Sequence, residues 1–202
     1  MAGGAIGAGG SLAVRWSGRV VWPLLLVTVV LCIDLITDAG SRSSQVGVLD
    51  EPAHLATGIL VLLLLVALLP TPPAVAFALA ALVACVAIDL DHIPQYLGWQ
   101  GLTEGTPRPY THSLLTPLVL CALAAVSRGS VRAIALGAAL GVCAHLLRDV
   151  ATANGVALFW PATSEASRIS HPSYIVVLVL IAAVGIACAA RAGSSSSKAL
   201  RR

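Results

Sequence analysis

Six apolar segments, each about as long as a membrane-spanning helix, dominate the sequence. A helix needs about 20 largely apolar residues to cross the ~30 Å hydrocarbon core of a bilayer. Of the 202 residues, 58% are hydrophobic and 10% are charged, whereas soluble domains carry about 25% charged residues. We therefore predict an all-α membrane protein, a bundle of about six transmembrane helices. The expected spans are residues 20–37, 54–70, 74–91, 112–127, 131–150 and 174–190.

The two ends of the chain differ in composition from the spans. Residues 1–19 begin with a stretch rich in glycine and alanine, and residues 191–202 are rich in serine and basic residues. We expect disordered cytoplasmic tails on either side of a six-helix domain at residues 20–190. The first apolar run is longer than the hydrophobic part of a signal peptide, and no clear cleavage site follows it. We therefore expect the first helix to be retained.

Basic residues predict the orientation in the membrane, because cytoplasmic loops carry an excess of lysine and arginine. With the N-terminus in the cytoplasm, three basic residues, Arg42, Arg108 and Arg168, fall in the outer loops. The eight on the inner side are Arg15, Arg19, Arg128, Arg132, Arg191, Lys198, Arg201 and Arg202. The sequence thus predicts a multi-pass protein of the plasma (inner) membrane with both termini cytoplasmic. The tryptophans then form two interfacial belts, Trp16 and Trp22 inside and Trp99 and Trp160 outside.

Small residues within the spans bear on helix packing. Gly137 and Gly141 have the GxxxG spacing, which lets two helix backbones approach closely. Every cysteine falls inside an expected span and no CxxC motif occurs, so we predict neither a disulfide framework nor a thiolate metal site. The cysteines are Cys32, Cys85, Cys121, Cys143 and Cys188.

Threading the chain through this topology places all five histidines at the outer end of the bundle. Asp89 and His92 are three residues apart, and His145 and Asp149 are four apart, so each pair shares one face of a helix. Polar groups in membrane spans are costly and mark functional sites. The alternative for each residue alone is a solvated interface carboxylate or a hydrogen-bonded core histidine.

Taken together, these imidazoles and carboxylates predict a divalent metal centre at the extracytoplasmic end. Nitrogen and oxygen ligands without sulfur favour zinc, manganese or iron over copper(I). The set is large enough for two ions bridged by a carboxylate, an arrangement that activates water against a phosphoryl group. His171 is left out because it has no helical partner, and Asp34 is expected at the membrane interface. The predicted ligands are His54, Asp89, Asp91, His92, His112, His145 and Asp149.

Four of the residues near this centre are candidates for catalysis. Asp89 or Asp91 could bridge the ions or accept a proton from the nucleophile. Arg108 and Arg148 could grip phosphate oxygens bidentately. The alternative for each arginine is an ion pair with a neighbouring aspartate.

The order of these motifs resembles the YdjM-like inner-membrane proteins, a family classed as membrane-bound metal-dependent hydrolases. The matching residues are His54 and Gly58; Asp89, Asp91 and His92; Arg108, Thr111, His112 and Ser113; and His145, Asp149, Thr152, Gly155, Trp160 and Pro161. Pro107 stands where the family often has a histidine, and the helix expected at residues 20–37 lies outside the matching region. The resemblance implies a metal-dependent hydrolase.

The position of the cluster at helix ends favours one substrate class, a phosphoester of a membrane lipid or a polyprenyl carrier at the outer boundary. A metal transporter or sensor is an alternative, although transport calls for ligands near the midplane or on both sides. A structural metal site is another, and it would have a closed coordination shell. The net charge of +3 comes mostly from the tails and gives no reason to expect a nucleic-acid partner. The oligomeric state stays open.

Overall fold

The computed structural model describes residues 7–39, 50–152 and 154–199, and the backbone alone for residues 7–19 and 192–199. Within these ranges the protein is built of helices without strands, so the predicted all-α membrane fold is confirmed. Arg42 and the side chains of Arg15, Trp16 and Arg19 lie outside what is described. The helices are α1 (Gly7–Thr37), α2 (Glu51–Leu68), α3 (Val75–Ala87), the 3-10 helix η2 (Ile88–His92), α4 (Ile93–Tyr96), α5 (Leu115–Val126), α6 (Gly129–Asp149) and α7 (His171–Ala199).

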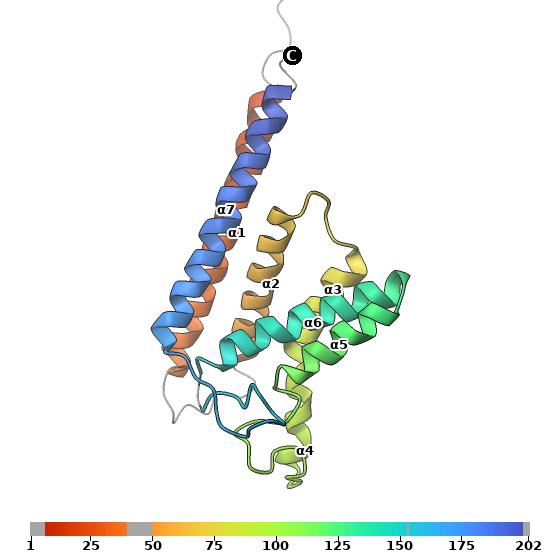
Figure 1. The fold of residues 1–202 in the computed structure, drawn as a ribbon. Helices are drawn as coiled ribbons and strands as arrows, with labels where there is room; N and C mark the ends of the chain where they lie inside the picture. Colours follow the sequence, from red (N-terminus) through yellow and green to blue (C-terminus); the bar gives the residue numbers. More distant parts are fainter. Residues whose placement is uncertain (1–6, 40–49, 153, 200–202) are drawn as a thin grey trace, which may run out of the picture.

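The helices form a long antiparallel pair and a second group packed beside it. Figure 1 shows α1 and α7 side by side and extending beyond α2, with α6 running obliquely to them. The loops that follow α4 and α6 gather at one end of the bundle, opposite the C-terminal end of α7 (Figure 1). Because α1 and α7 run in opposite directions, the end of α1 and the start of α7 meet at the loop end.

Among the described residues, five helices are long and apolar enough to cross a membrane, with α3, η2 and α4 counted as one span, and α5 is shorter than its predicted span. At 12 residues, α5 is about 18 Å long and covers roughly half of a bilayer's hydrocarbon core. The span expected to open at His112 begins at Leu115 instead. The preceding residues are held in the loop, because the Leu114 N–H donates to the carbonyl of Leu158 and the Ser113 hydroxyl donates to that of Tyr110.

The third span also differs from a continuous helix. Its α-helical part ends at Ala87, and the residues that carry Asp89 and His92 form the 3-10 helix η2. Pro94 follows closely and has no N–H to donate to the carbonyl of Leu90, so a regular α-helical ladder cannot continue here. The tighter helix turns the acidic residues toward the loop end of the bundle.

Both terminal helices are longer than the sequence predicts. Residues 7–19 and 191–199, expected to be disordered, are helical in α1 and α7. Helix propagation past the apolar spans explains this difference, because extending an existing helix is far easier than nucleating one. Residues 1–6 and 200–202 lie outside the described part of the chain.

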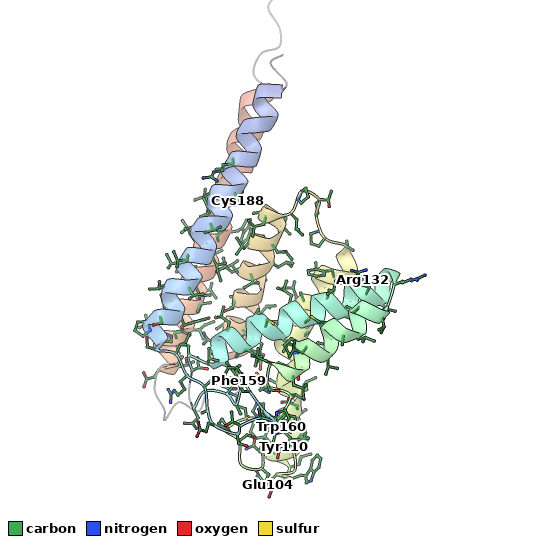
Figure 2. The ribbon with its side chains drawn as sticks, viewed as in Figure 1. Glu104, Tyr110, Arg132, Phe159, Trp160 and Cys188 are labelled. Carbon is green, nitrogen blue, oxygen red and sulfur yellow. The ribbon has the colours of Figure 1, made fainter. Side chains whose placement is uncertain are left out.

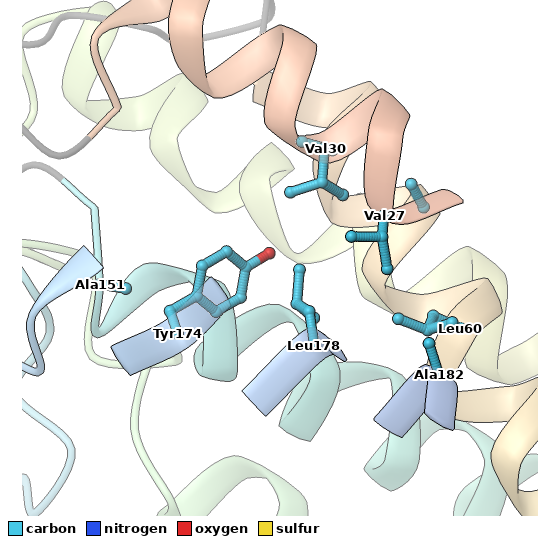
Figure 3. Close-up of a cluster of buried hydrophobic side chains, with 9 residues drawn as sticks. Val27, Val30, Leu60, Ala151, Tyr174, Leu178 and Ala182 are labelled. Atoms are coloured by element: carbon cyan, nitrogen blue, oxygen red, sulfur yellow. The ribbon is translucent and has the colours of Figure 1, made fainter. Parts of the chain in front are cut away.

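The interior between the long pair and α2 is apolar. Figure 3 shows Leu178 and Tyr174 of α7 directed toward α1 and α2, where Val30 and Leu60 lie. The Tyr174 hydroxyl is 2.8 Å from the Thr57 hydroxyl. This core fixes α1 and α7 against the start of α2, and α2 contributes residues to the polar cluster described below.

The GxxxG spacing in α6 makes the close helix contact that it predicts. A Cβ added at Gly141 would lie 2.1 Å from the carbonyl oxygen of Ala81, and one at Gly137 the same distance from that of Phe77. The two glycines, which have only hydrogen atoms in place of a side chain, therefore let the α6 backbone lie directly against the α3 carbonyl oxygens. This contact aligns the end of α3 with the end of α6.

We expect Gly141→Ala to destabilise the protein by about 1–3 kcal/mol, because the α3 backbone must shift to admit a methyl group. Gly185→Ala is the matched control: a Cβ there would lie 3.7 Å from its nearest neighbour, Leu64 Cα. Chemical unfolding of the detergent-solubilised protein measures both effects. Equal stability of the two variants would contradict the proposed tightness of the α3–α6 contact.

Candidate metal centre

A polar cluster lies at the loop end of the bundle, where three helices and a loop meet. It takes His54 from α2, Asp89 and His92 from η2, His112 from the loop before α5, and the pair at the end of α6. The side chains of His54, His112, His145 and Asp149 are at most 1% exposed, whereas those of Asp89, Asp91 and His92 are 15–20% exposed. The cluster is thus closed on one side and accessible on the other.

Six of the seven predicted ligands fall into three overlapping groups, each with donor atoms within 4.8 Å of one another. Asp89, His112 and His145 each belong to two groups, so the groups form one continuous site. The groups are His54 with Asp89 and His145; Asp89 with His92 and His112; and His112 with His145 and Asp149. Asp91 is the predicted ligand that belongs to none of them.

Several nitrogen and oxygen atoms of the cluster are buried and lack hydrogen bonds. His145 Nε2 lies 3.0 Å from Asp149 Oδ2 and 3.4 Å from Asp89 Oδ1. His145 Nε2, His54 Nδ1 and Asp149 Oδ2 are buried and make no hydrogen bond within the described part of the chain. Buried polar atoms are almost always satisfied, so unsatisfied ones call for an explanation. A divalent cation among these nitrogen and oxygen atoms would satisfy them, and the residues therefore fit a metal ion.

The hydrogen bonding of His145 prepares it as a ligand. Its Nδ1 lies 2.8 Å from the carbonyl oxygen of Cys85. A carbonyl only accepts hydrogen bonds, so Nδ1 carries the proton and, in the neutral ring, Nε2 has a lone pair directed into the cluster. This arrangement is typical of metal-ligating histidines.

The imidazole of His54 on α2 lies directly beside that of His145, and close packing of α2 against α3 allows this approach. The rings of His54 and His145 stack with centroids 3.8 Å apart. A Cβ at Gly58 would lie 2.8 Å from Cys85 Sγ, so only glycine leaves room for this approach. The Cys85 thiol in turn donates to the carbonyl of His54. Stacked imidazoles at this distance would repel if both were protonated, which favours a shared cation over two protons.

Two carboxylates of the cluster, Asp50 and Glu51, were missed by the sequence reasoning. Asp50 Oδ2 lies 3.3 Å from His54 Nε2, and Glu51 interacts with Asp89. The spacing of Asp50 and His54 could have revealed this contact, because residues four apart share one face of a helix. The sequence predicts the start of this span at residue 54, so Asp50 and Glu51 were expected in the preceding loop.

Arg148 makes the ion pairs with aspartates that were the alternative to phosphate binding, and its catalytic role stays a prediction. The side chain is fully buried, and its guanidinium donates to the carboxylates of Asp50 and Asp34. Asp34, expected at the membrane interface, is buried inside the protein, and its other oxygen lies 2.8 Å from His171 Nε2. Arg148 therefore ties α1 to Asp50, which contacts His54. His171 stands apart from the ligand groups, as the sequence predicts.

The charges around the cluster favour a cation. Burial alone would lower the pKa of His112, but its contacts with the Asp89 and Asp91 carboxylates raise this pKa above the ordinary value. Burial alone would raise the pKa of Asp50, but His54 and Arg148 lower it to about 2. The surroundings of His112 thus attract positive charge, and Asp50 stays ionised.

Arg108 and Asp91 lie on the accessible side of the cluster. Arg108 Nη2 is 3.2 Å from Asp149 Oδ1, and the arginine side chain is 17% exposed. Asp91 accepts a hydrogen bond from the Thr111 hydroxyl and lies 3.3 Å from His112 Nδ1. Asp91 is placed to orient His112, a role that carboxylates commonly have beside metal-ligating histidines.

Aromatic residues lie in the loops at the same end of the bundle as the cluster. Tyr110 and Trp160 stack with ring centroids 4.5 Å apart, and Figure 2 shows both in the loops at the end of the molecule opposite Cys188. Trp99 and Phe159 of the same loops are 58% and 57% exposed. Exposed aromatic rings are typical of the membrane–water interface.

Comparison with known proteins identifies the family. The family described as YdjM inner membrane protein matches residues 49–201. The match covers three quarters of the chain and includes every residue of the cluster, so the chain belongs to the YdjM inner membrane protein family. Searches of curated proteins and of solved structures gave no match.

We expect His112→Ala and His145→Ala each to lose bound metal, because each residue belongs to two ligand groups. Both variants should still insert, since insertion follows apolar length. His171→Ala is the control and should keep its metal. Elemental analysis of the purified variants measures the metal content. Loss of metal in His171→Ala and retention in His145→Ala would show that the ligand set is wrong.

Proposed function

We propose that this YdjM-family protein is a metal-dependent hydrolase that cleaves a phosphoester of a membrane lipid or a lipid-linked substrate such as a polyprenyl phosphate. The observation that carries the proposal is the set of three overlapping ligand groups at the loop end of the bundle. Nitrogen and oxygen donors in this number suit two divalent ions, zinc or manganese. Such ions, when bound, polarise phosphoryl oxygens and lower the pKa of water to about 7.

The ligand residues divide between holding the ions and linking them. His54, His112 and His145 would supply imidazoles from the closed side, and His92 would supply one nearer the opening. Asp89 belongs to two of the three groups and would be a ligand common to both. Asp149 completes the buried side, where Arg108 balances part of its charge.

Two residues on the accessible side are assigned to the reaction itself. As water attacks phosphorus, Asp91 accepts the proton that the water loses, a role worth roughly 10²–10⁴-fold. Its Oδ1 is buried and has no hydrogen-bond partner in the described residues, so this atom can accept. Arg108 holds non-reacting phosphate oxygens with guanidinium donors other than Nη2. The ester P–O bond then breaks, and the leaving alcohol oxygen takes up a proton.

The partial exposure of the cluster favours an enzyme over a purely structural metal site. A structural site has a closed shell of ligands, whereas Asp89, Asp91 and His92 keep part of their side chains exposed. A transporter calls for polar ligands along the path across the membrane. In the described residues the three ligand groups all lie at one end of the bundle.

The distribution of basic residues supports an extracytoplasmic site with both chain termini in the cytoplasm. Substrate would then be taken from the outer leaflet. Labelling of a cysteine placed at exposed Gln100 tests the orientation. A membrane-impermeant reagent should label it in intact cells, and labelling only after permeabilisation would place the site on the cytoplasmic side.

We expect Arg108→Lys to lower the turnover of a lipid phosphomonoester and leave the metal content unchanged, because the charge is kept and the bidentate fork is lost. Asp89→Asn should lose metal and activity together, since the negative charge of a ligand shared by two groups disappears. Release of phosphate from defined lipids measures turnover, with chelated protein as the blank.

Full metal occupancy without cleavage of any phosphoester would contradict the hydrolase proposal and favour a structural metal. Loss of metal in Arg108→Lys would also contradict the division of roles, because this arginine would then belong to the architecture of the cluster.

A further inference from the structure

A second polar network connects the metal centre with the long helix pair and reaches α1. Its middle member is Arg148 of α6, whose side chain is fully buried. Arg148 Nη2 donates to Asp34 Oδ1 of α1 over 2.6 Å, and Nε donates to Asp50 Oδ1, just before α2, over 3.0 Å. One guanidinium therefore joins α1, α2 and α6.

The network ends at a predicted metal ligand. Asp50 Oδ2, the oxygen that Arg148 leaves free, lies 3.3 Å from His54 Nε2. An ionised carboxylate only accepts hydrogen bonds, so in the neutral ring Nε2 carries the proton and Nδ1 keeps its lone pair. His54 Nδ1 is buried and has no hydrogen-bond partner among the described residues. Carboxylates commonly orient metal-ligating histidines in this way.

The guanidinium of Arg148 is held on three sides. Its Nη2 donates to both Asp34 and Asp50. Its Nη1 lies 3.4 Å from the Tyr174 hydroxyl of α7, which is itself 2.8 Å from the Thr57 hydroxyl. Without Asp34, Nη2 loses one of its two acceptors, and the guanidinium is no longer fixed against Asp50.

The helix that carries Asp34 lies outside the region matched by the family. That match covers residues 49–201, which include Arg148 and Asp50 but not α1. Asp34 is the single charged residue in the apolar run of residues 20–37, yet its side chain is only 3% exposed. Charged residues inside membrane spans are costly and mark functional sites. The position of Asp34 therefore calls for an explanation beyond membrane insertion.

We infer that α1 is a functional part of the metal centre: Asp34 holds Arg148, which holds Asp50, and Asp50 in turn orients the ligand His54. Asp34, Arg148 and Asp50 are positioning residues, because none of them belongs to a ligand group. The inference rests on the metal centre of the proposed function and not on the reaction. It adds that metal affinity depends on a carboxylate in a helix outside the family match.

The zinc affinity of the full-length protein, measured by competition with a chromophoric chelator, tests the inference. Loss of a residue that orients a metal ligand weakens metal binding by about 10–100-fold. We expect Asp50→Asn and Asp34→Asn each to weaken zinc binding by an amount in this range. Asp38→Asn is the matched control, because Asp38 lies four residues after Asp34, is exposed and carries the same charge. Its backbone has a φ of 49°, which asparagine also adopts.

The coupling between two substitutions separates positioning from a role in helix packing alone. If Asp34 acts through Asp50, its replacement adds little once Asp50 has been replaced. The double variant Asp34→Asn/Asp50→Asn should therefore bind zinc within about twofold of Asp50→Asn. Independent roles would instead multiply the two losses.

A second variant is informative if Asp34→Asn fails to fold, because this substitution leaves Arg148 with one carboxylate. Asp34→Leu combined with Arg148→Met replaces the ion pair with apolar side chains, a change that is often neutral for stability. Zinc binding should still weaken by about tenfold or more, since Asp50 is no longer held. Chemical unfolding of the zinc-free variants in detergent shows whether each is folded.

The possible results separate this inference from the proposed function. Native zinc affinity in folded Asp34→Asn, an equal loss in Asp38→Asn, or losses that multiply in the double variant would overturn the inference and leave the hydrolase proposal standing. If the variants behave as expected but no lipid phosphoester is cleaved, the inference stands and the hydrolase proposal fails. A native protein that binds no zinc or manganese would overturn both.

Discussion

The structure depends on an excess of carboxylates buried at one end of a membrane protein. Such charges are costly away from water unless they are paired or bind a metal ion. Arg148 meets part of this need, because it pairs with Asp34 and Asp50. Arg108 meets another part at Asp149. The remaining carboxylates face imidazole nitrogens, and a divalent ion is the partner that would balance them.

The apolar helices serve this polar centre through close backbone contacts. Gly141 brings α6 against α3 at Ala81, and Gly58 brings α2 against Cys85. Cys85 lies between these contacts, and its carbonyl accepts the hydrogen bond that fixes the ring of His145. The residue that makes the close helix contact therefore also orients a candidate metal ligand. A change at either glycine would move a ligand as well as a helix.

The sequence predicted the membrane fold and most of the cluster, because both follow from local patterns. Apolar length identifies spans, and spacings of three or four residues place Asp89 with His92 and His145 with Asp149. What it could not predict depends on contacts between distant segments. The pairing of Arg148 with Asp34 joins α6 to α1, and nothing in either local sequence specifies it.

The errors at helix ends have a similar origin. Loop contacts delay the start of α5 until Leu115, and the third span changes from α-helix to 3-10 helix at Ile88, so His112 and Asp89 approach from non-α-helical backbone. The 3-10 helix and the later start of α5 thus place Asp89 and His112 outside regular α-helix, where the two side chains meet.

The claim that nitrogen and oxygen ligands hold divalent metal is tested most directly by X-ray absorption at the zinc edge of the zinc-loaded protein. We expect imidazole and carboxylate ligands at about 2.0–2.2 Å and no sulfur. Sulfur ligands at about 2.3 Å, or the spectrum of fully hydrated zinc, would contradict it.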